Sequence, residues 1–198
     1  MKKMLCMRAD RKPARLAALF AAAASMMSMT SAYGREASQW PDANQVYHIY
    51  DSADYTDFAA LTKAEKAKPS GSRTAYKAEL HADIDLSGSA ADIAIYIYGG
   101  LFDGKGHTVT VAMADNGDDC LAPFNTLTAG GEIRNIDIAG TITYDEAMYI
   151  GGLAGTISDD ATISACRSSV AIQRAAGSTL YQQCRGGIAA YASDGNTI

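Results

Sequence analysis

Apolar residues recur with helical spacing in one early segment of the chain. Between residues 52 and 67 they stand three or four positions apart, which is the spacing of one helix face. The members of this face are Tyr55, Phe58, Ala59, Leu61 and Ala64. Ser52 or Asp54 is expected to cap the first turn by accepting bonds from unpaired backbone N–H groups, and residues 69–72 (Pro-Ser-Gly-Ser) end the segment. The pattern predicts one short amphipathic helix over 52–67.

The pattern beyond the helix is that of strands. Short runs of alternating apolar and polar residues, separated by Gly, Asn and Asp, continue to the last residue. The first strands are expected at 46–50, 76–80, 84–86 and 93–98. One early helix followed by short strands favours an all-β body. We expect the helix to cap it, because an open sheet edge and an exposed core end promote aggregation.

The strand-forming region also repeats. Residues 151–155 (Gly-Gly-Leu-Ala-Gly) reappear as 186–190 (Gly-Gly-Ile-Ala-Ala), and Ile163 reappears as Ile198, both 35 residues later. Ile133 precedes Ile163 by 30 residues. Imperfect repeats of this length, built from strands and glycine turns, are typical of a solenoid. Each unit is expected to form one and a half to two short coils.

The first 32 residues have the composition of an export signal. Six Lys and Arg residues precede an unbroken apolar run at 16–24, and small residues that suit cleavage follow it. The run is too short to span a bilayer as a stable helix. The sequence therefore predicts a Sec-type signal peptide, with a buried helix as the alternative. After its removal we expect a secreted or cell-surface protein that is not integral to the membrane.

Removal of the leader changes the charge of the chain. The full sequence carries 17 basic and 22 acidic residues, a net charge of −5. Six of the basic residues but only one acidic residue lie in 1–32, which leaves 11 basic and 21 acidic residues. Such an acidic protein repels phosphate backbones, so nucleic acid is not an expected partner. A solvated acidic surface without a specific ligand is the simplest interpretation of the charge.

Three cysteines, Cys120, Cys166 and Cys184, remain after the leader. Their odd number allows at most one internal disulfide, and which pair would form it stays open. Their spacing matches no zinc motif, so no metal site is expected at them. Cys166 and Cys184 are otherwise expected to point into the core or a turn, where thiols behave as small apolar groups.

Three motifs resemble those of the GLUG-motif family, which comprises bacterial surface and secreted proteins. They are residues 82–86 (Ala-Asp-Ile-Asp-Leu), 101–109 (Leu-Phe-Asp-Gly-Lys-Gly-His-Thr-Val), and the 151–155 unit followed by 163–166 (Ile-Ser-Ala-Cys). The resemblance covers residues 46–198. It implies a pectate-lyase-like β-helix with a structural or adhesive role, and with activity usually in other domains. The chain departs from the family at Ala165, where Asn is usual.

The predicted fold class is all-β: a right-handed parallel β-helix, or solenoid, with a short N-terminal α-helical cap, preceded by the signal peptide. Its C-terminal end is expected to be incomplete, because the last unit stops at Ile198, the position equivalent to Ile163. The expected division is 1–32 signal peptide, 33–45 linker, 46–80 N-terminal strand and capping helix, and 81–198 truncated solenoid repeats.

The motif residues are expected to have structural roles. They are Asp83, Asp85, Phe102, Asp103, Gly104, Gly106, His107, Gly151, Gly152, Gly155, Cys166, Gly186 and Gly187. Asp103 is expected to accept a backbone N–H bond from two residues on, and Gly104 and Gly106 to adopt positive φ. Phe102 is expected in the core. His107 is expected to stabilise the corner, since no partner for a base or ligand role is evident.

Two acidic groups leave alternatives open. Asp83 and Asp85 share one strand face, where they either hold Ca²⁺, act on a sugar, or form only the solvent face. The other group is an oxygen-rich loop that resembles half of a calcium loop, with a plain exposed turn as the alternative. Its weak Ca²⁺ candidates are Asp115, Asn116, Asp118 and Asp119. No other cofactor and no catalytic residue is predicted.

The leading functional hypothesis is an exported structural or adhesive module that contacts glycans or other cells. Tyr96 and Tyr98 share a predicted face, which either stacks on sugars or completes a sheet. A polysaccharide lyase or hydrolase on the same fold is one alternative. A non-functional N-terminal fragment of a larger adhesin is another, whose open C-terminal end would bind further solenoid repeats or self-associate.

Overall fold

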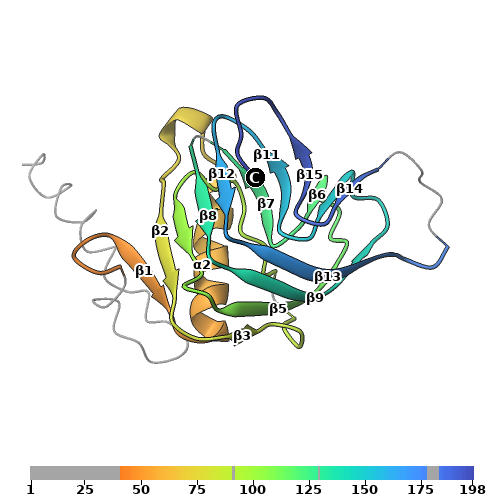
Figure 1. The fold of residues 1–198 in the computed structure, drawn as a ribbon, viewed down its shortest axis with the longest axis horizontal. Helices are drawn as coiled ribbons and strands as arrows, with labels where there is room; N and C mark the ends of the chain where they lie inside the picture. The colour runs from red at the N-terminus through yellow and green to blue at the C-terminus, as the bar shows by residue number, and fades with distance from the viewer. Residues whose placement is uncertain (1–40, 91, 129, 178–182) are drawn as a thin grey trace, which may run out of the picture. The chain divides into compact units, whose positions relative to one another are not determined.

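Parallel strands and one short helix make up the described part of the protein (Figure 1). The computed structural model describes residues 41–198 apart from 91, 129 and 178–182, and these residues belong to one compact unit. The expected signal peptide and residues 33–40 of the expected linker lie outside the described residues. An all-β fold of parallel strands with one short α-helix is thereby confirmed.

The elements follow one another in a regular order. They are β1 (Val46–Ile49), α2 (Ser52–Glu65), the 3-10 turn η2 (Ser70–Ser72), β2 (Lys77–Leu80), β3 (Ile84–Asp85), β4 (Leu101–Asp103), β5 (Thr108–Ala114), β6 (Cys120–Leu121), β7 (Phe124–Leu127), β8 (Glu132–Arg134), β9 (Asp137–Tyr144), β10 (Tyr149–Gly151), β11 (Ala154–Ile157), β12 (Thr162–Ser164), β13 (Arg167–Arg174), β14 (Cys184–Gly186) and β15 (Ala189–Ala192).

These strands form four parallel sheets. Their strand orders are β1-β2-β4-β8-β12, β13-β9-β5-β3, β14-β10-β6 and β15-β11-β7. The chain visits the four sheets in the same order three times, through β4–β7, β8–β11 and β12–β15. Each circuit returns to the first sheet one strand further along, so equivalent strands lie side by side (Figure 1).

The register of the sheets follows the sequence repeat. Asp137 on β9 pairs with Arg167 on β13, 30 residues later. Tyr149 on β10 pairs with Cys184 on β14, 35 residues later. One repeat therefore makes one circuit of the four sheets. The expected one and a half to two coils per repeat was wrong, because a circuit needs four short strands together with their turns.

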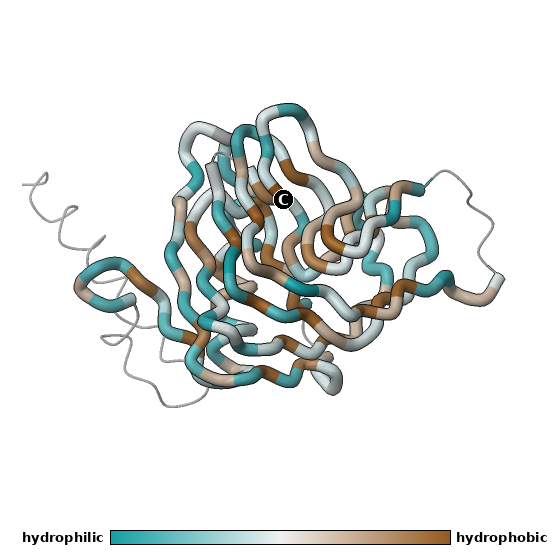
Figure 2. Tube along the Cα trace, in the orientation of Figure 1, coloured by the Kyte–Doolittle hydropathy of each residue, from teal (hydrophilic) through white to brown (hydrophobic). Residues whose placement is uncertain are grey.

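Apolar columns across the strands form the core. Phe102, Ile133 and Ile163 are register partners on β4, β8 and β12 and are 0–3% exposed. Figure 2 shows hydrophobic positions recurring on neighbouring strands. A parallel pair whose register equals the sequence repeat places equivalent residues next to each other, so each column packs like on like.

Helix α2 begins at Ser52, as predicted, but its N-cap is one residue earlier than the predicted caps. Asp51 is the N-cap, in an extended conformation with φ −150°, and its side chain accepts a 2.9 Å bond from the Asp54 N–H. The Asp54 carboxylate in turn accepts the Tyr50 N–H at 2.9 Å. The predicted caps, Ser52 and Asp54, were therefore wrong, because Ser52 already has helical geometry and Asp54 lies in the first turn. The helix ends at Glu65, two residues before the predicted end.

One face of α2 packs against the core. The Phe58 ring lies 5.5–6.3 Å from four other rings. These belong to Tyr47, Tyr76, Tyr98 and Phe102. Tyr55 and Ala59 are also buried, as predicted, but Ala64 is exposed while Thr62 and Glu65 are buried. With the buried Asp54, the helix therefore buries three polar residues that the apolar pattern alone does not reveal.

Residues 93–98 do not form the continuous strand that their alternation predicts. They make two isolated bridges, at Ile95 and Tyr98. Between them the Tyr96 N–H donates to the Thr62 hydroxyl of α2 at 3.2 Å. This N–H is therefore not available for a hydrogen bond between strands. Tyr96 and Tyr98 are 2% and 1% exposed, so of the two alternatives for their shared face, stacking on sugars was wrong.

Candidate functional site

A row of polar side chains crosses the outer face of the first sheet. The register pairs His48 with Glu79, Glu79 with Asp103, and Asp103 with Arg134. The apolar neighbours of these residues along each strand point into the core, because successive strand residues face opposite sides. Two acids, an imidazole and a guanidinium are thereby held in one line on a rigid sheet.

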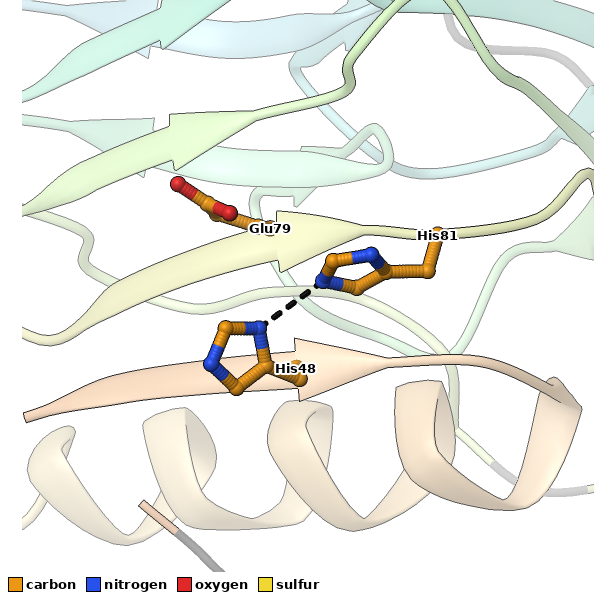
Figure 3. Close-up of side chains that lie close together, drawn as sticks. All are labelled: His48, Glu79 and His81. Atoms are coloured by element: carbon orange, nitrogen blue, oxygen red, sulfur yellow. Dashed lines mark hydrogen bonds between the residues drawn. The ribbon is translucent and has the colours of Figure 1, made fainter. Parts of the chain in front are cut away.

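The row begins with a pair of histidines (Figure 3). His48 Nδ1 lies 2.8 Å from His81 Nε2. Together with a carboxylate oxygen of Glu79, these ligand atoms lie within 4.8 Å of one another. Strand β1 supplies His48, whereas Glu79 and His81 stand two residues apart at the end of β2 and therefore face the same side. Among the described residues, this is the one group of three His, Cys, Asp or Glu side chains that could hold a metal ion.

Asp42 orients the first of these rings. Its Oδ1 accepts 2.8 Å bonds from the Asn44 and Val46 N–H groups, and its Oδ2 lies 3.2 Å from His48 Nε2. The Val46 N–H bond is the main reason why the pKa of Asp42 is lowered. A carboxylate here favours the proton on Nε2 of His48, which leaves the Nδ1 lone pair directed at His81.

His81 is held from two further sides. Its ring stacks on Tyr50, with 4.6 Å between the centroids. Desolvation by the surrounding side chains, followed by the charge of His48, lowers the pKa of His81. A lowered pKa favours the neutral imidazole, which is the form that binds metals.

Glu79 is shared with a cation. Its Oε1 lies 3.1 Å from Lys105 Nζ, which is also 3.5 Å from Asp103 Oδ2. Glu79 lies on β2, Asp103 lies on β4, and Lys105 lies in the corner after β4. Glu79 therefore links the histidine pair to the next acid of the row.

Asp103 anchors the corner that follows β4. The predicted bond from the Lys105 N–H is confirmed at 2.9 Å, and Arg134 Nε and Asn135 Nδ2 also donate, at 3.0 and 3.1 Å. Burial raises the pKa of Asp103, but these donors outweigh it and hold the pKa at about 2. The carboxylate is 5% exposed and fully engaged, which fits the expected structural role.

The expected glycine conformations at this corner are half right. Gly106 adopts φ +83°, as predicted, but Gly104 does not adopt positive φ, and Lys105 does instead at φ 52°. A Cβ at Gly104 would lie 2.5 Å from the Asn135 carbonyl oxygen, so close packing requires this glycine. The equivalent corners place Asn135 at φ 52° and Ala165 at φ 51°. Asn tolerates this region, and Ala does so only with strain.

Close packing also explains the repeated glycines. A Cβ at Gly151 or at Gly186 would clash with the carbonyl oxygen three residues on, so the same turn recurs 35 residues later. Gly152 approaches the Gly187 carbonyl of the next circuit, and Gly155 approaches that of Asn125 in the preceding one. None of the glycines in these two blocks has positive φ.

Asp83 and Asp85 lie on the exposed face of their strand, as their alternation predicts. Asp83 Oδ1 accepts the Thr108 N–H at 2.9 Å and lies 3.2 Å from His107 Nδ1. Asp85 accepts the Ser87 N–H at 2.9 Å. The Asp85 carboxylate is thus bound within its own turn, whereas the Asp83 carboxylate is bound to His107 and Thr108, at the start of β5.

Two carboxylates of the oxygen-rich loop, those of Asp115 and Asp118, bond to the rest of the protein, whereas Asp119 is exposed. The loop contains the calcium candidates Asp115, Asn116, Asp118 and Asp119. Asp115 Oδ2 accepts the N–H groups of residues 145–147 at 2.7–2.9 Å. Asp118 pairs with Lys66 of α2 and accepts the Tyr96 hydroxyl at 2.9 Å, and Asn116 donates to Asp118 at 3.3 Å. The loop therefore ties the helix and the following circuit together.

The three cysteines of the described region are free. Cys166 is partly buried, with its Sγ 3.1 Å from the Ser164 carbonyl oxygen. Cys184 is exposed at the start of strand β14, so its expected place in the core or a turn was wrong. Cys120 and Cys184 both pair with Tyr149, from opposite sides. Two strand spacings, roughly 9.6 Å, separate them, which is too far for a disulfide.

Sequence reasoning missed the histidine cluster. His48 and His81 are 33 residues apart, and only the pairing of β1 with β2 brings them together. A signal was available in Glu79-Leu80-His81, since both polar residues of a strand with this alternation share a face. The register that adds His48 was not predictable from the pattern.

Comparison of the chain with protein-family models, with curated proteins and with solved structures finds no match. The resemblance to the GLUG-motif family therefore stays a prediction from its motifs. In the part of the chain that the structure describes, no helix is long and apolar enough to cross a membrane.

Proposed function

We propose that the four sheets are the sides of a right-handed parallel β-solenoid capped by α2. The observation that carries this proposal is the threefold visit to the same four sheets, with register partners 30 or 35 residues apart. In such a stack, the equivalent inward residues of successive circuits form a buried apolar column, and the outer faces are extended and polar. Covering of the first circuit by Phe58 supports the cap.

The proposed role is that of an exported scaffold, of the GLUG-motif kind, whose outer faces bind glycans or other cells. The basic and apolar pattern of residues 1–32 supports export. N-terminal sequencing of the chain recovered outside the cytoplasm of a bacterial host is expected to show cleavage near residue 32. Recovery of only the uncleaved chain in the cytosol contradicts export.

One outer face favours sugar binding. Tyr191 on β15 is 51% exposed, and its ring centroid lies 6.0 Å from that of the partly buried Tyr149. Aromatic faces of this kind stack on the apolar faces of sugars. In the same sheet Thr156 pairs with Tyr191 and donates to Thr126 at 3.1 Å, which extends a polar line across the strands.

Binding of the purified full chain to immobilised mucin and polysaccharides tests the adhesive role. We expect micromolar binding that Tyr191→Ala weakens at least severalfold. Tyr50→Ala is the matched control, because Tyr50 is 54% exposed but stacks on His81 on another sheet. Absence of micromolar binding to any of these polymers contradicts the adhesive role but not the scaffold.

A polysaccharide lyase or hydrolase is the alternative, because Asp103 and Arg134 place an acid beside a guanidinium. Their mutual pairing and the burial of Asp103 favour the scaffold. An open hollow of about 390 Å³ lies elsewhere, beside Ile172 and Arg185. Release of new reducing ends from pectin-like polymers, abolished by Asp103→Asn in a folded variant, would support the enzyme instead.

A further inference from the structure

The histidine cluster on the outer face of β1 and β2 has no part in the proposed scaffold or in sugar binding. We propose that His48 Nδ1, His81 Nε2 and a carboxylate oxygen of Glu79 form a binding site for a divalent metal ion of the zinc class. His48 and Glu79 are register partners on the paired strands β1 and β2, and His81 directly follows β2, so the three side chains lie close together (Figure 3).

The ligand set and its spacing suit zinc. Two imidazoles and one carboxylate hold zinc in sites that keep a fourth position for water. Nitrogen ligands of a tetrahedral zinc stand roughly 3.3 Å apart, given Zn–N bonds of about 2.0 Å. His48 Nδ1 and His81 Nε2 are 2.8 Å apart, and Glu79 lies within 4.8 Å of both. Small side-chain rotations therefore create the site without movement of the strands.

The Asp42 carboxylate prepares His48 as a ligand. The bond between His48 Nε2 and Asp42 Oδ2, at 3.2 Å, keeps the proton on the nitrogen that faces away from His81. Carboxylates that orient metal-binding histidines in this way raise affinity, and their loss weakens binding 10- to 100-fold. The 2.8 Å contact requires one shared proton between the two rings. When a metal binds between the two rings, this proton leaves the space between them, and neutral His81 carries its single ring proton on Nδ1.

One neighbour opposes the metal. Lys105 Nζ is 3.1 Å from Glu79 Oε1, and its positive charge competes for the same carboxylate. Lys105 occupies a left-handed corner at φ 52°, where Asn is well tolerated. Lys105→Asn therefore removes the competing charge while preserving the backbone, and it should tighten metal binding severalfold.

The decisive experiment uses ring ¹⁵N NMR of the full chain titrated with Zn²⁺. The chain contains three histidines, so His107 is an internal control for the other two. We expect His48 Nδ1 and His81 Nε2 to shift to metal-bound values at one equivalent, while His107 is unchanged. Equal shifts of all three rings, or no saturable shift, would overturn the proposal.

Calorimetric titrations of matched variants provide the second readout. His48→Gln and His81→Gln should each weaken Zn²⁺ binding at least tenfold, Asp42→Asn about tenfold, and His107→Gln less than twofold. Ca²⁺, which prefers oxygen ligands, should not compete. Equal Zn²⁺ affinities of the His81→Gln and His107→Gln variants would contradict the site. Zinc that binds only to the cysteines would give this result.

Thermal unfolding separates a metal site from mere histidine packing. Zn²⁺ that binds only the folded state should raise the Tm of the wild-type chain, because it joins edge strand β1 to β2. The same addition should leave the Tm of the His48→Gln variant unchanged. A Tm that Zn²⁺ does not raise in either chain would count against the site.

Discussion

The last strand of the second sheet buries its inward positions less completely than the strand before it. Ile142 on β9 and Ile172 on β13 are register partners. Ile142 is 0% exposed, whereas Ile172 is only partly buried. At the other end α2 covers the interior, and Phe102 beneath Phe58 is 0% exposed. The repeat determines which side chains point inward, and the neighbouring layer determines how completely water is excluded from them.

The physical consequence is an uneven distribution of stability. Apolar burial stabilises in proportion to the area removed from water. The residues of β13 alternate between exposed and partly buried, whereas their inward register partners Ile138, Ile142 and Tyr144 on β9 are fully buried. Substitutions under the helix should therefore cost more than the same substitutions in the last circuit.

The largest expected effect is at the helix. Phe58→Ala should lower the free energy of unfolding by about 4 kcal/mol, because it empties the space among several rings. Ile172→Ala, in the last circuit, should lower it by about 1 kcal/mol. Urea denaturation measures both. Equal losses would mean that the two ends are equally well packed.

The second largest expected effect is a loss of stability in acid, through Glu65 at the C-terminal end of α2. Burial raises the pKa of Glu65, but bonds from Lys68, Tyr76 and the Thr74 N–H outweigh it and lower the pKa from 4.5 to about 2. A depressed pKa stabilises the fold above the unfolded-state value and ceases to do so as pH falls toward 2. The loss should reach about 3 kcal/mol.

Urea denaturation between pH 6 and pH 2 checks this prediction. The Glu65→Gln variant should be less stable than the wild type at pH 6 and should depend less on pH. A wild-type chain and variant with parallel pH profiles would show that Glu65 does not contribute.

A matched pair of glycines compares the layers directly. Gly152→Ala should cost about 2 kcal/mol, because its Cβ would meet the Gly187 carbonyl oxygen. Gly187→Ala should change stability by less than about 0.5 kcal/mol, since nothing lies within 4 Å of its added Cβ. Thermal melts of the two variants test the contrast, which fails if both are tolerated equally.

The smallest expected effect is a gain in the last circuit. Ala165→Gly should stabilise the protein by about 1 kcal/mol, because it relieves the strain of φ 51°. Asn135→Gly at the equivalent corner should not stabilise, because it removes the 3.1 Å bond to Asp103. Chemical denaturation distinguishes them, and a loss of stability in Ala165→Gly would show that the strain is compensated elsewhere.

Local sequence patterns predicted the helices and strands better than they predicted the contacts between these elements. The helical spacing of Tyr55 and Phe58 located α2 to within two residues at its C-terminal end. The Asp103 turn bond depends on neighbours in sequence and was predicted correctly. The alternation at 93–98 misled, because a donor at Tyr96 is taken by Thr62, 34 residues away in sequence. Prediction failed where the partner of a residue belongs to another element.

Periodicity and turn residues were enough to predict the helix, most of the short strands and the repeat length. The register of β1 with β2, and with it the contact of His48 with His81, depends on the packing of the whole chain. The same packing also explains why Gly104 must be a glycine. Contacts between strands depend on which residues stand opposite one another, and no local pattern in a single strand specifies its partner.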